Sequence, residues 1–337
     1  MHGSSPDVGI AGYTLGGGLG WYGRALGLAA NHVTAAEIVI GDGTIVRTDA
    51  EHDPELLWAL RGGGGSFGIV TALEFSLFDI ATAYAGMMIF DIGRAEEVLR
   101  CWAPWAAAAP DEVTTAFRIL HLPPLPELPP FLSGRSVVVI DGAVLSSDDA
   151  ADRILAELRA LQPEIDTFLR VPAAALSRLH MDPEGSGSGI GGSAMLTRAP
   201  QATIDAFLGA VGERSSTSLM MGELRQLGGA LARPAIGGGA VSHLDGQFLA
   251  FATGMVFTPE MALGVGADVA AFAGALAPWT GGRRYLNFVE DAVDPRQSYD
   301  ELTWRRLASI RSAVDPSGVF AANHPVPRLY EDGRPTC

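Results

Sequence analysis

The chain has 337 residues, and its 23 lysines and arginines against 38 aspartates and glutamates give a net charge of −15 at pH 7. This acidic balance disfavours nucleic acid and anionic membranes as partners, because neutralising phosphate groups requires basic patches. No run of about 18 apolar residues predicts a transmembrane helix. Two cysteines, Cys101 and Cys337, are too few for a disulfide framework or a metal site. The first residues lack the features of a secretory signal, so we expect a cytoplasmic protein.

Residues 9–20 form a glycine-rich segment, Gly-Ile-Ala-Gly-Tyr-Thr-Leu-Gly-Gly-Gly-Leu-Gly. Such a run suits a backbone that approaches a ligand closely or takes unusual dihedral angles. A NAD-binding fingerprint matches Gly18–Gly23 with Asp42 as its acidic residue, but it requires a preceding strand and a parallel second strand. Pro6 interrupts the preceding segment, and Asp42 lies in a hairpin turn. A structural bend and a flavin-phosphate loop remain as interpretations.

The next segments predict a hairpin at 36–48 around the turn at Asp42 and a helix beginning after Asp53-Pro54. A second glycine run follows at 62–65, and an alternating segment at 68–77 predicts a strand.

The middle of the chain alternates predicted strands with amphipathic helices. Several strands follow one another without an intervening helix, which favours an antiparallel sheet with helices on one face. Two segments, 123–130 and 185–192, predict surface loops because they are rich in proline or glycine. The predicted strands lie near 84–91, 134–145, 217–227 and 247–257, and the predicted helices near 93–109, 148–161, 200–213, 260–277 and 299–313.

Four motifs, at residues 12–31, 57–71, 285–288 and 314–327, give the chain a family resemblance. They include Gly-Tyr-Thr-Leu-Gly-Gly-Gly-Leu-Gly-Trp, Leu-Arg-Gly-Gly-Gly-Gly-Ser-Phe-Gly, Tyr-Leu-Asn-Phe and Val-Asp-Pro-Ser-Gly-Val-Phe. In this order they resemble the FAD-linked oxidases of the berberine-bridge-enzyme-like group, which have a PCMH-type FAD-binding domain. The resemblance extends over essentially the whole chain but over only part of the family's length.

The resemblance implies an α+β fold in three parts. Residues 1–80 would form the rear half of the FAD-binding domain, and residues 81–283 an antiparallel-sheet substrate domain covered by helices. Residues 284–337 would be the C-terminal segment that returns to the FAD domain. In the family, further strands continue the sheet of the FAD-binding domain, and the part of the family that this chain resembles does not include them. Without these strands, apolar surface is expected near residues 36–48 and 68–77.

The resemblance also implies the residues that hold FAD. The glycines would let the backbone approach the pyrophosphate, main-chain groups at the second motif would contact the adenine side, and the asparagines would face the ribityl chain or the flavin. The expected cofactor residues are Gly16, Gly17, Gly18, Gly20, Gly68, Val70, Tyr285, Asn287 and Asn323, and no metal site is expected.

The resemblance implies a two-electron oxidation of a hydroxyl-bearing small molecule in secondary metabolism, with hydride passing to flavin N5 and O₂ reoxidising the flavin. Tyr285 is the expected base by resemblance. Tyr13 is the second candidate, because it occupies a place where several relatives carry histidine. Because a phenol has a pKa of about 10, a polar neighbour is required, and Glu223 is the candidate.

Two attachment features of the family are not found in this sequence. The segment resembling Arg-Ser-Gly-Gly-His, whose histidine is tied to the flavin, does not occur, and Ser5 stands where some members have cysteine. We therefore expect FAD to bind non-covalently if at all, and this chain to be a poor oxidase. The alternative is a truncated, non-catalytic remnant or a partner subunit. The sequence indicates neither the substrate nor the oligomeric state.

Overall fold

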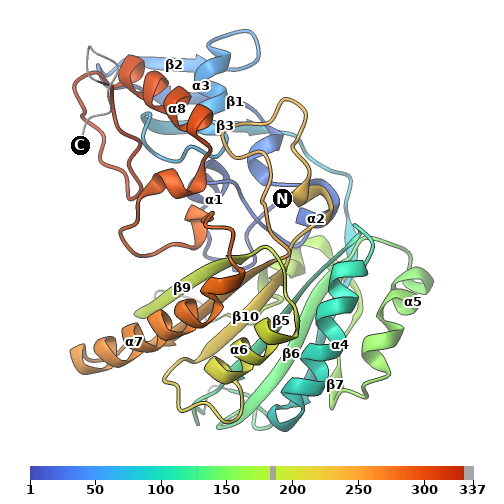
Figure 1. Cartoon of the computed structure of the whole chain (residues 1–337). Helices are drawn as coiled ribbons and strands as arrows, with labels where there is room; N and C mark the ends of the chain where they lie inside the picture. Colours follow the sequence, from blue (N-terminus) through green and yellow to red (C-terminus); the bar gives the residue numbers. More distant parts are fainter. Residues whose placement is uncertain (127, 183–186, 330–337) are drawn as a thin grey trace.

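The computed structural model describes residues 1–126, 128–182 and 187–329, which form two antiparallel sheets with helices packed on them (Figure 1). Cys337 lies outside the described residues, and Cys101 lies in a helix as a free thiol. The predicted α+β class, with an antiparallel sheet covered by helices, is confirmed.

The small sheet has the strand order β2-β1-β3, formed by β1 (Val33–Val39), β2 (Ile45–Thr48) and β3 (Ile69–Phe75). The predicted hairpin joins β1 and β2, and Asp53 caps the predicted helix α3 (Pro54–Leu60) by accepting a hydrogen bond from the Leu56 N–H. Both outer strands carry exposed apolar side chains, in agreement with the expectation for these segments. These side chains are Ile45, Ile69 and Phe75, with Leu77 just beyond β3.

The large sheet has the strand order β7-β4-β6-β5-β10-β11-β9, with β8 also paired to β4, and every pairing is antiparallel. Its strands are β4 (Thr82–Asp91), β5 (Val113–His121), β6 (Ser136–Val144), β7 (Ile165–Asp166), β8 (Leu169–Pro172), β9 (Gly189–Leu196), β10 (Met221–Gln226) and β11 (Phe248–Met255).

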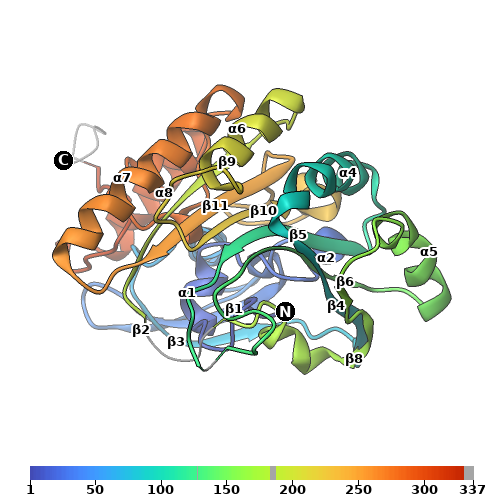
Figure 2. The same cartoon turned by 90° about the horizontal axis from the view of Figure 1, so that it is seen from below.

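Four helices cover one face of this sheet, and the N-terminal segment with the small sheet lies on the other side (Figure 2). Alternation along each strand produces the two faces: Phe117 and Leu224 point into the core beneath the helices, whereas Ala116 packs against Trp21 and Tyr22 on the opposite face. The covering helices are α4 (Ala95–Ala108), α5 (Asp148–Arg159), α6 (Gln201–Val211) and α7 (Pro259–Leu276).

The C-terminal segment packs against the N-terminal one. Helix α8 (Glu301–Val314) lies on the small sheet and α3 (Figure 1), where Trp304 and Leu307 join a core that includes Ile38 and Leu56. The Tyr299 hydroxyl donates to the Gly62 carbonyl over 2.9 Å. The two motif-rich ends of the chain therefore share one core, while the exact domain boundaries stay a prediction.

Several elements differ from the sequence expectation, including the short strands β7 and β8, which were not predicted. Strand β5 was not predicted, and part of the expected glycine loop at 185–192 is the outer strand β9, with 183–186 outside the described residues. A Cβ at Gly192 would collide with Val269 of α7, so the glycines let this helix approach the strand closely. The glycine-rich N-terminal segment contains a short helix, α1 (Ile10–Leu15), followed by α2 (Gly23–Leu26).

One helical segment, Pro259–Trp279, is long and apolar enough to cross a membrane by length and composition, although no such segment was predicted. In this fold, Val265, Val269 and Phe272 pack into the core of the large sheet. The one carboxylate in the middle of the helix, Asp268, accepts hydrogen bonds from the main chain and hydroxyl of Ser218. The helix is thus anchored as a cover of β9 and β11.

Candidate active site

The glycine-rich segment and the Tyr-x-Asn motif meet directly. The Tyr285 hydroxyl oxygen accepts a hydrogen bond from the Leu19 N–H over 3.1 Å and one from Asn287 Nδ2 over 3.3 Å. Asn287 Nδ2 also donates to the Tyr13 carbonyl over 2.9 Å. Residues separated by more than 260 positions in the sequence are therefore brought into one hydrogen-bonded group.

The contacts made by the glycines explain why larger residues are excluded there. A Cβ at Gly16 would overlap the Asn287 side chain, and one at Gly17, whose φ is +129°, would lie 2.9 Å from the Tyr285 ring and hydroxyl. The N–H groups of Gly16 and Gly17 donate to carbonyls within the N-terminal helical turn. Gly16 and Gly17 thus leave the space that Asn287 and Tyr285 of the Tyr-x-Asn motif occupy. The contact of these glycines with FAD stays a prediction.

Both candidate bases are buried phenols. Burial raises the pKa of Tyr285 above its ordinary value, although the hydrogen bonds from the Leu19 N–H and Asn287 act in the opposite direction. Burial, together with the neighbouring Tyr285, also raises the pKa of Tyr13, while Arg225 lowers it. The Tyr13 hydroxyl has no hydrogen-bond partner among the described residues.

A cavity of about 390 Å³ opens beside this group, and we call it the Arg225 cavity. Its wall combines apolar side chains with three polar ones, and Arg225 is the only charged residue among the described residues that line it. The lining residues are Gly3, Ser4, Val8, Gly9, Gly12, Tyr13, Leu19, Arg225, Asn287 and Phe288.

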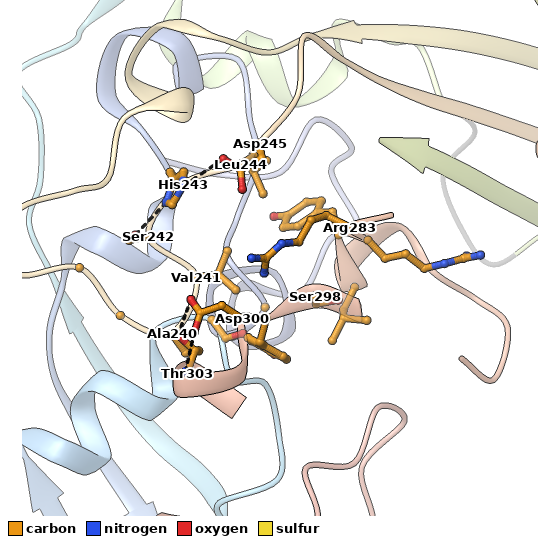
Figure 3. A pocket seen from close by; sticks show the side chains of 18 of the residues that line it. Ala240, Val241, Ser242, His243, Leu244, Asp245, Arg283, Ser298, Asp300 and Thr303 are labelled. Carbon is orange, nitrogen blue, oxygen red and sulfur yellow. Dashed lines mark hydrogen bonds and ion pairs between the residues drawn. The ribbon is translucent and has the colours of Figure 1, made fainter. Parts of the chain in front are cut away.

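A second cavity, of about 380 Å³, is lined in part by Tyr285 and is shown in Figure 3; we call it the Tyr285 cavity. The loop at 238–245, the segment 283–286 and the start of α8 surround it. Its polar wall includes His243, which pairs with Asp245 over 3.2 Å, and Asp300, which accepts from the N–H of Thr303. Gly16 and Tyr285 contribute to the wall, so this cavity also reaches the motif.

The third predicted catalytic residue, Glu223, belongs to a buried charge cluster on the sheet. Glu223 on β10 lies directly opposite Arg118 on β5, and Arg118 pairs with Asp141 of β6. All three face away from the covering helices, and Asp141 and Glu223 are fully buried. Burial alone would raise the pKa of the Asp141 carboxyl, but Arg118, His180 and Arg225 together hold it below its ordinary value.

Glu223 pairs with Arg225, its Oε1 lying 2.8 Å from Arg225 Nε, and its oxygens accept no aligned hydrogen bond from the described residues. Among the groups that change the pKa of the Tyr285 phenol, Arg225 is the charged one, and it lowers this pKa. The polar neighbour that sequence reasoning sought for Tyr285 is therefore supplied by Asn287 and, at longer range, Arg225.

Gly68 and Val70, which were also predicted to contact the cofactor, have structural contacts of their own. Gly68 has a φ of +153°, and a Cβ there would strike the Val39 carbonyl. Val70 pairs with Ile38 in the small sheet. Asn323 is exposed and precedes His324, whose Nε2 lies 3.2 Å from the Val289 carbonyl oxygen. Their contacts with a cofactor stay predictions.

Sequence reasoning did not single out Arg118, Asp141, His180 or Arg225. The available signal was a charged residue at alternate positions in otherwise apolar strands, as in Val-Val-Val-Ile-Asp and Gly-Glu-Leu-Arg-Gln. Which charges meet depends on strand order, and strand β5, which carries Arg118, was not predicted.

Comparison with known proteins defines the class of fold. No protein-family model matches the chain. The structure superimposes on BBE-like 1 of Physcomitrella patens with a TM-score of 0.81 at 20% identity, covering 98% of this chain and 72% of that protein. The fold is therefore that of the berberine-bridge-enzyme-like proteins.

Local sequence similarity agrees with this class. The chain is 42% identical over 77 residues to the xylooligosaccharide oxidase of Thermothelomyces thermophilus, covering 23% of this chain and 16% of the relative. It is 40% identical over 106 residues to the uncharacterised FAD-linked oxidoreductase YvdP of Bacillus subtilis, covering 31% of this chain and 24% of the relative. The predicted resemblance to FAD-linked oxidases of the berberine-bridge-enzyme-like group is thus confirmed, and the aligned segments span a quarter or less of these two relatives.

Proposed function

We propose that the protein is an FAD-dependent oxidoreductase that oxidises a hydroxyl-bearing small molecule with O₂ as acceptor, in secondary metabolism. The observation that carries this proposal is the Tyr-x-Asn motif seated on the glycine-rich segment, with two N–H donors aimed at the Tyr285 oxygen. The xylooligosaccharide oxidase named above supports the same reaction class.

We assign the flavin to the part of the Arg225 cavity that Gly9, Gly12, Tyr13 and Asn287 line. A Cβ at Gly9 or Gly12 would meet open space, so a planar ring can approach the backbone of α1 there. The Tyr13 hydroxyl is buried without a partner among the described residues, which favours a ligand or water as its missing partner. Asn287 is exposed, and because its two N–H donors are engaged by Tyr13 and Tyr285, its Oδ1 is the group it offers to a ligand, as an acceptor. Bound FAD, held non-covalently, would supply the hydride acceptor.

A residue of this chain would accept the proton of the substrate hydroxyl. The two donors at the Tyr285 oxygen stabilise its negatively charged form, which is the form able to accept a proton. Burial opposes ionisation, so the phenol needs these donors and the positive charge of Arg225 to act as a base. Tyr13 is the second candidate for the same role.

Titration of the purified protein with FAD tests this proposal. We expect quenching of flavin fluorescence on binding and bleaching of the flavin absorbance when an oxidisable alcohol is added under nitrogen. Tyr285→Phe should bind FAD but bleach more slowly, whereas Tyr84→Phe, which loses a hydroxyl bonded to Asp152 on the helix-covered side, should behave as wild type. A protein that gains no flavin signal in excess FAD would instead be a non-catalytic relative.

A further inference from the structure

We infer that Arg225 is the anchor of an anionic substrate, and that the Arg225 cavity selects a ring-bearing alcohol that carries a carboxylate. This inference rests on the proposed function, because it names the substrate class of the same site. No carboxylate lines the cavity among the described residues, and its one charged group is this guanidinium, whose side chain is 16% exposed.

The guanidinium, which lines the cavity, retains hydrogen-bonding capacity. Arginine has five N–H donors in a fixed planar arrangement. Three contacts engage it within the described chain: Nε faces Glu223 at 2.8 Å, one terminal nitrogen donates to the Ser4 hydroxyl over 3.0 Å, and the other lies 3.0 Å from His180 Nε2. Two donors therefore remain, and a carboxylate is the group that matches paired guanidinium donors.

A chain of buried groups fixes the position of Arg225. Because arginine can only donate, His180 Nε2 must accept from it, so the proton of this imidazole is on Nδ1. Nδ1 lies 2.9 Å from the Asp141 carboxylate, which Arg118 also contacts. The Trp21 ring packs on His180 at 4.6 Å between centroids. The guanidinium is therefore held before any ligand arrives, which lowers the ordering cost of binding.

The cavity also has a wall for a flat apolar group. The Arg225 guanidinium lies over the Phe288 ring, 5.0 Å from its centroid, and Val8 and Leu19 line the same space. The positive charge of Arg225 acts on both phenols, since it lowers the pKa of Tyr13 and of Tyr285 against the opposing effect of burial. An anion beside Arg225 thus has its ring among apolar side chains and its hydroxyl in the cavity that Tyr13 lines.

Calorimetric titration with two matched probes, 4-(hydroxymethyl)benzoate and 4-(hydroxymethyl)benzamide, tests the inference at constant ionic strength. The probes share the ring and the alcohol, and they differ in that the carboxylate is replaced by an uncharged amide of similar shape. We expect the benzoate to bind the wild-type protein at least 10-fold more tightly than the benzamide. Arg225→Gln should bring the two affinities together, and Arg225→Lys should keep part of the preference. Arg153→Gln, which removes an exposed charge from α5, should keep all of it.

Equal affinity for the two probes in the wild-type protein, or no binding of either, would overturn the inference without reference to any variant. Retention of the full preference in a folded Arg225→Gln protein would also overturn it. FAD binding, measured separately by fluorescence quenching, distinguishes the two proposals. If the protein binds FAD but does not prefer the benzoate, the proposed oxidoreductase function is retained and the anionic substrate is rejected. If it prefers the benzoate but does not bind FAD, only the proposed function is rejected.

Discussion

Substitution of Gly17 by alanine tests whether the glycine-rich segment is built around Tyr285. The backbone at Gly17 has a φ of +129°, and strain of about 1–3 kcal/mol is expected for any L-residue there. The new Cβ would also lie 2.9 Å from the Tyr285 ring and hydroxyl, so the ring must move. Movement would weaken the Leu19 N–H bond, which is worth about 1 kcal/mol. We expect a total loss of stability of roughly 3 kcal/mol.

Gly43 provides the matched control for this substitution. It has a φ of +86° in the β1–β2 turn, and a Cβ there would meet nothing within 4 Å. Gly43→Ala therefore carries backbone strain without a collision, and we expect it to cost about 1 kcal/mol. The difference between the two variants therefore contains the contact with Tyr285 together with the larger backbone strain at a φ of +129°.

Urea unfolding, followed by circular dichroism and tryptophan fluorescence, would give the two stabilities. Hydrogen exchange at the Leu19 amide would report the local effect, with faster exchange in Gly17→Ala and no change in Gly43→Ala. Equal destabilisation by the two substitutions, with Leu19 exchange unaltered, would refute the reasoning. The larger Gly17→Val change should in addition abolish FAD binding while the large sheet remains folded; unchanged FAD affinity would mean that the segment is only a bend.

Two further predictions concern Tyr285 and Asp141. If the protein turns over, Tyr285→Phe should slow flavin reduction by about 10²-fold with little change in substrate affinity, as stopped-flow absorbance would show, and an unaltered rate would transfer the role to Tyr13. Asp141→Asn should destabilise the fold by about 3–5 kcal/mol at pH 7, because Arg118 loses its buried counter-ion. Since the folded-state pKa of Asp141 is lowered, its contribution is present above the unfolded value of about 3.9 and is lost as pH falls through the folded value. The urea midpoints of wild type and variant should therefore converge below pH 4, and a constant gap would contradict this assignment.

The family and the fold class could be predicted from the sequence because their signals are local. The turn at Asp42, the cap at Asp53 and the alternation of strands depend on neighbouring residues, and each appears in the structure where it was expected. Strand β5 was missed although Pro110 and Pro123 bound it, and β9 was missed because its glycines resemble a loop. In β9, Gly192 leaves room for Val269 of α7, and this tertiary reason is not contained in local sequence preference.

The candidate site also has some features that the sequence predicts and others that only the tertiary structure determines. Sequence motifs alone identified Tyr285, Asn287 and the glycines, since each motif is contiguous in the chain. Only the tertiary structure decided that Asn287 holds Tyr13 and that Leu19 donates to Tyr285, because these contacts join segments more than 260 residues apart. The charge cluster around Arg225 is likewise a product of strand order and register, which place residues from separate strands and a loop on one buried face. The physical reason is that hydrophobic periodicity fixes which face a residue occupies, whereas its partners on that face are chosen by how the strands pair.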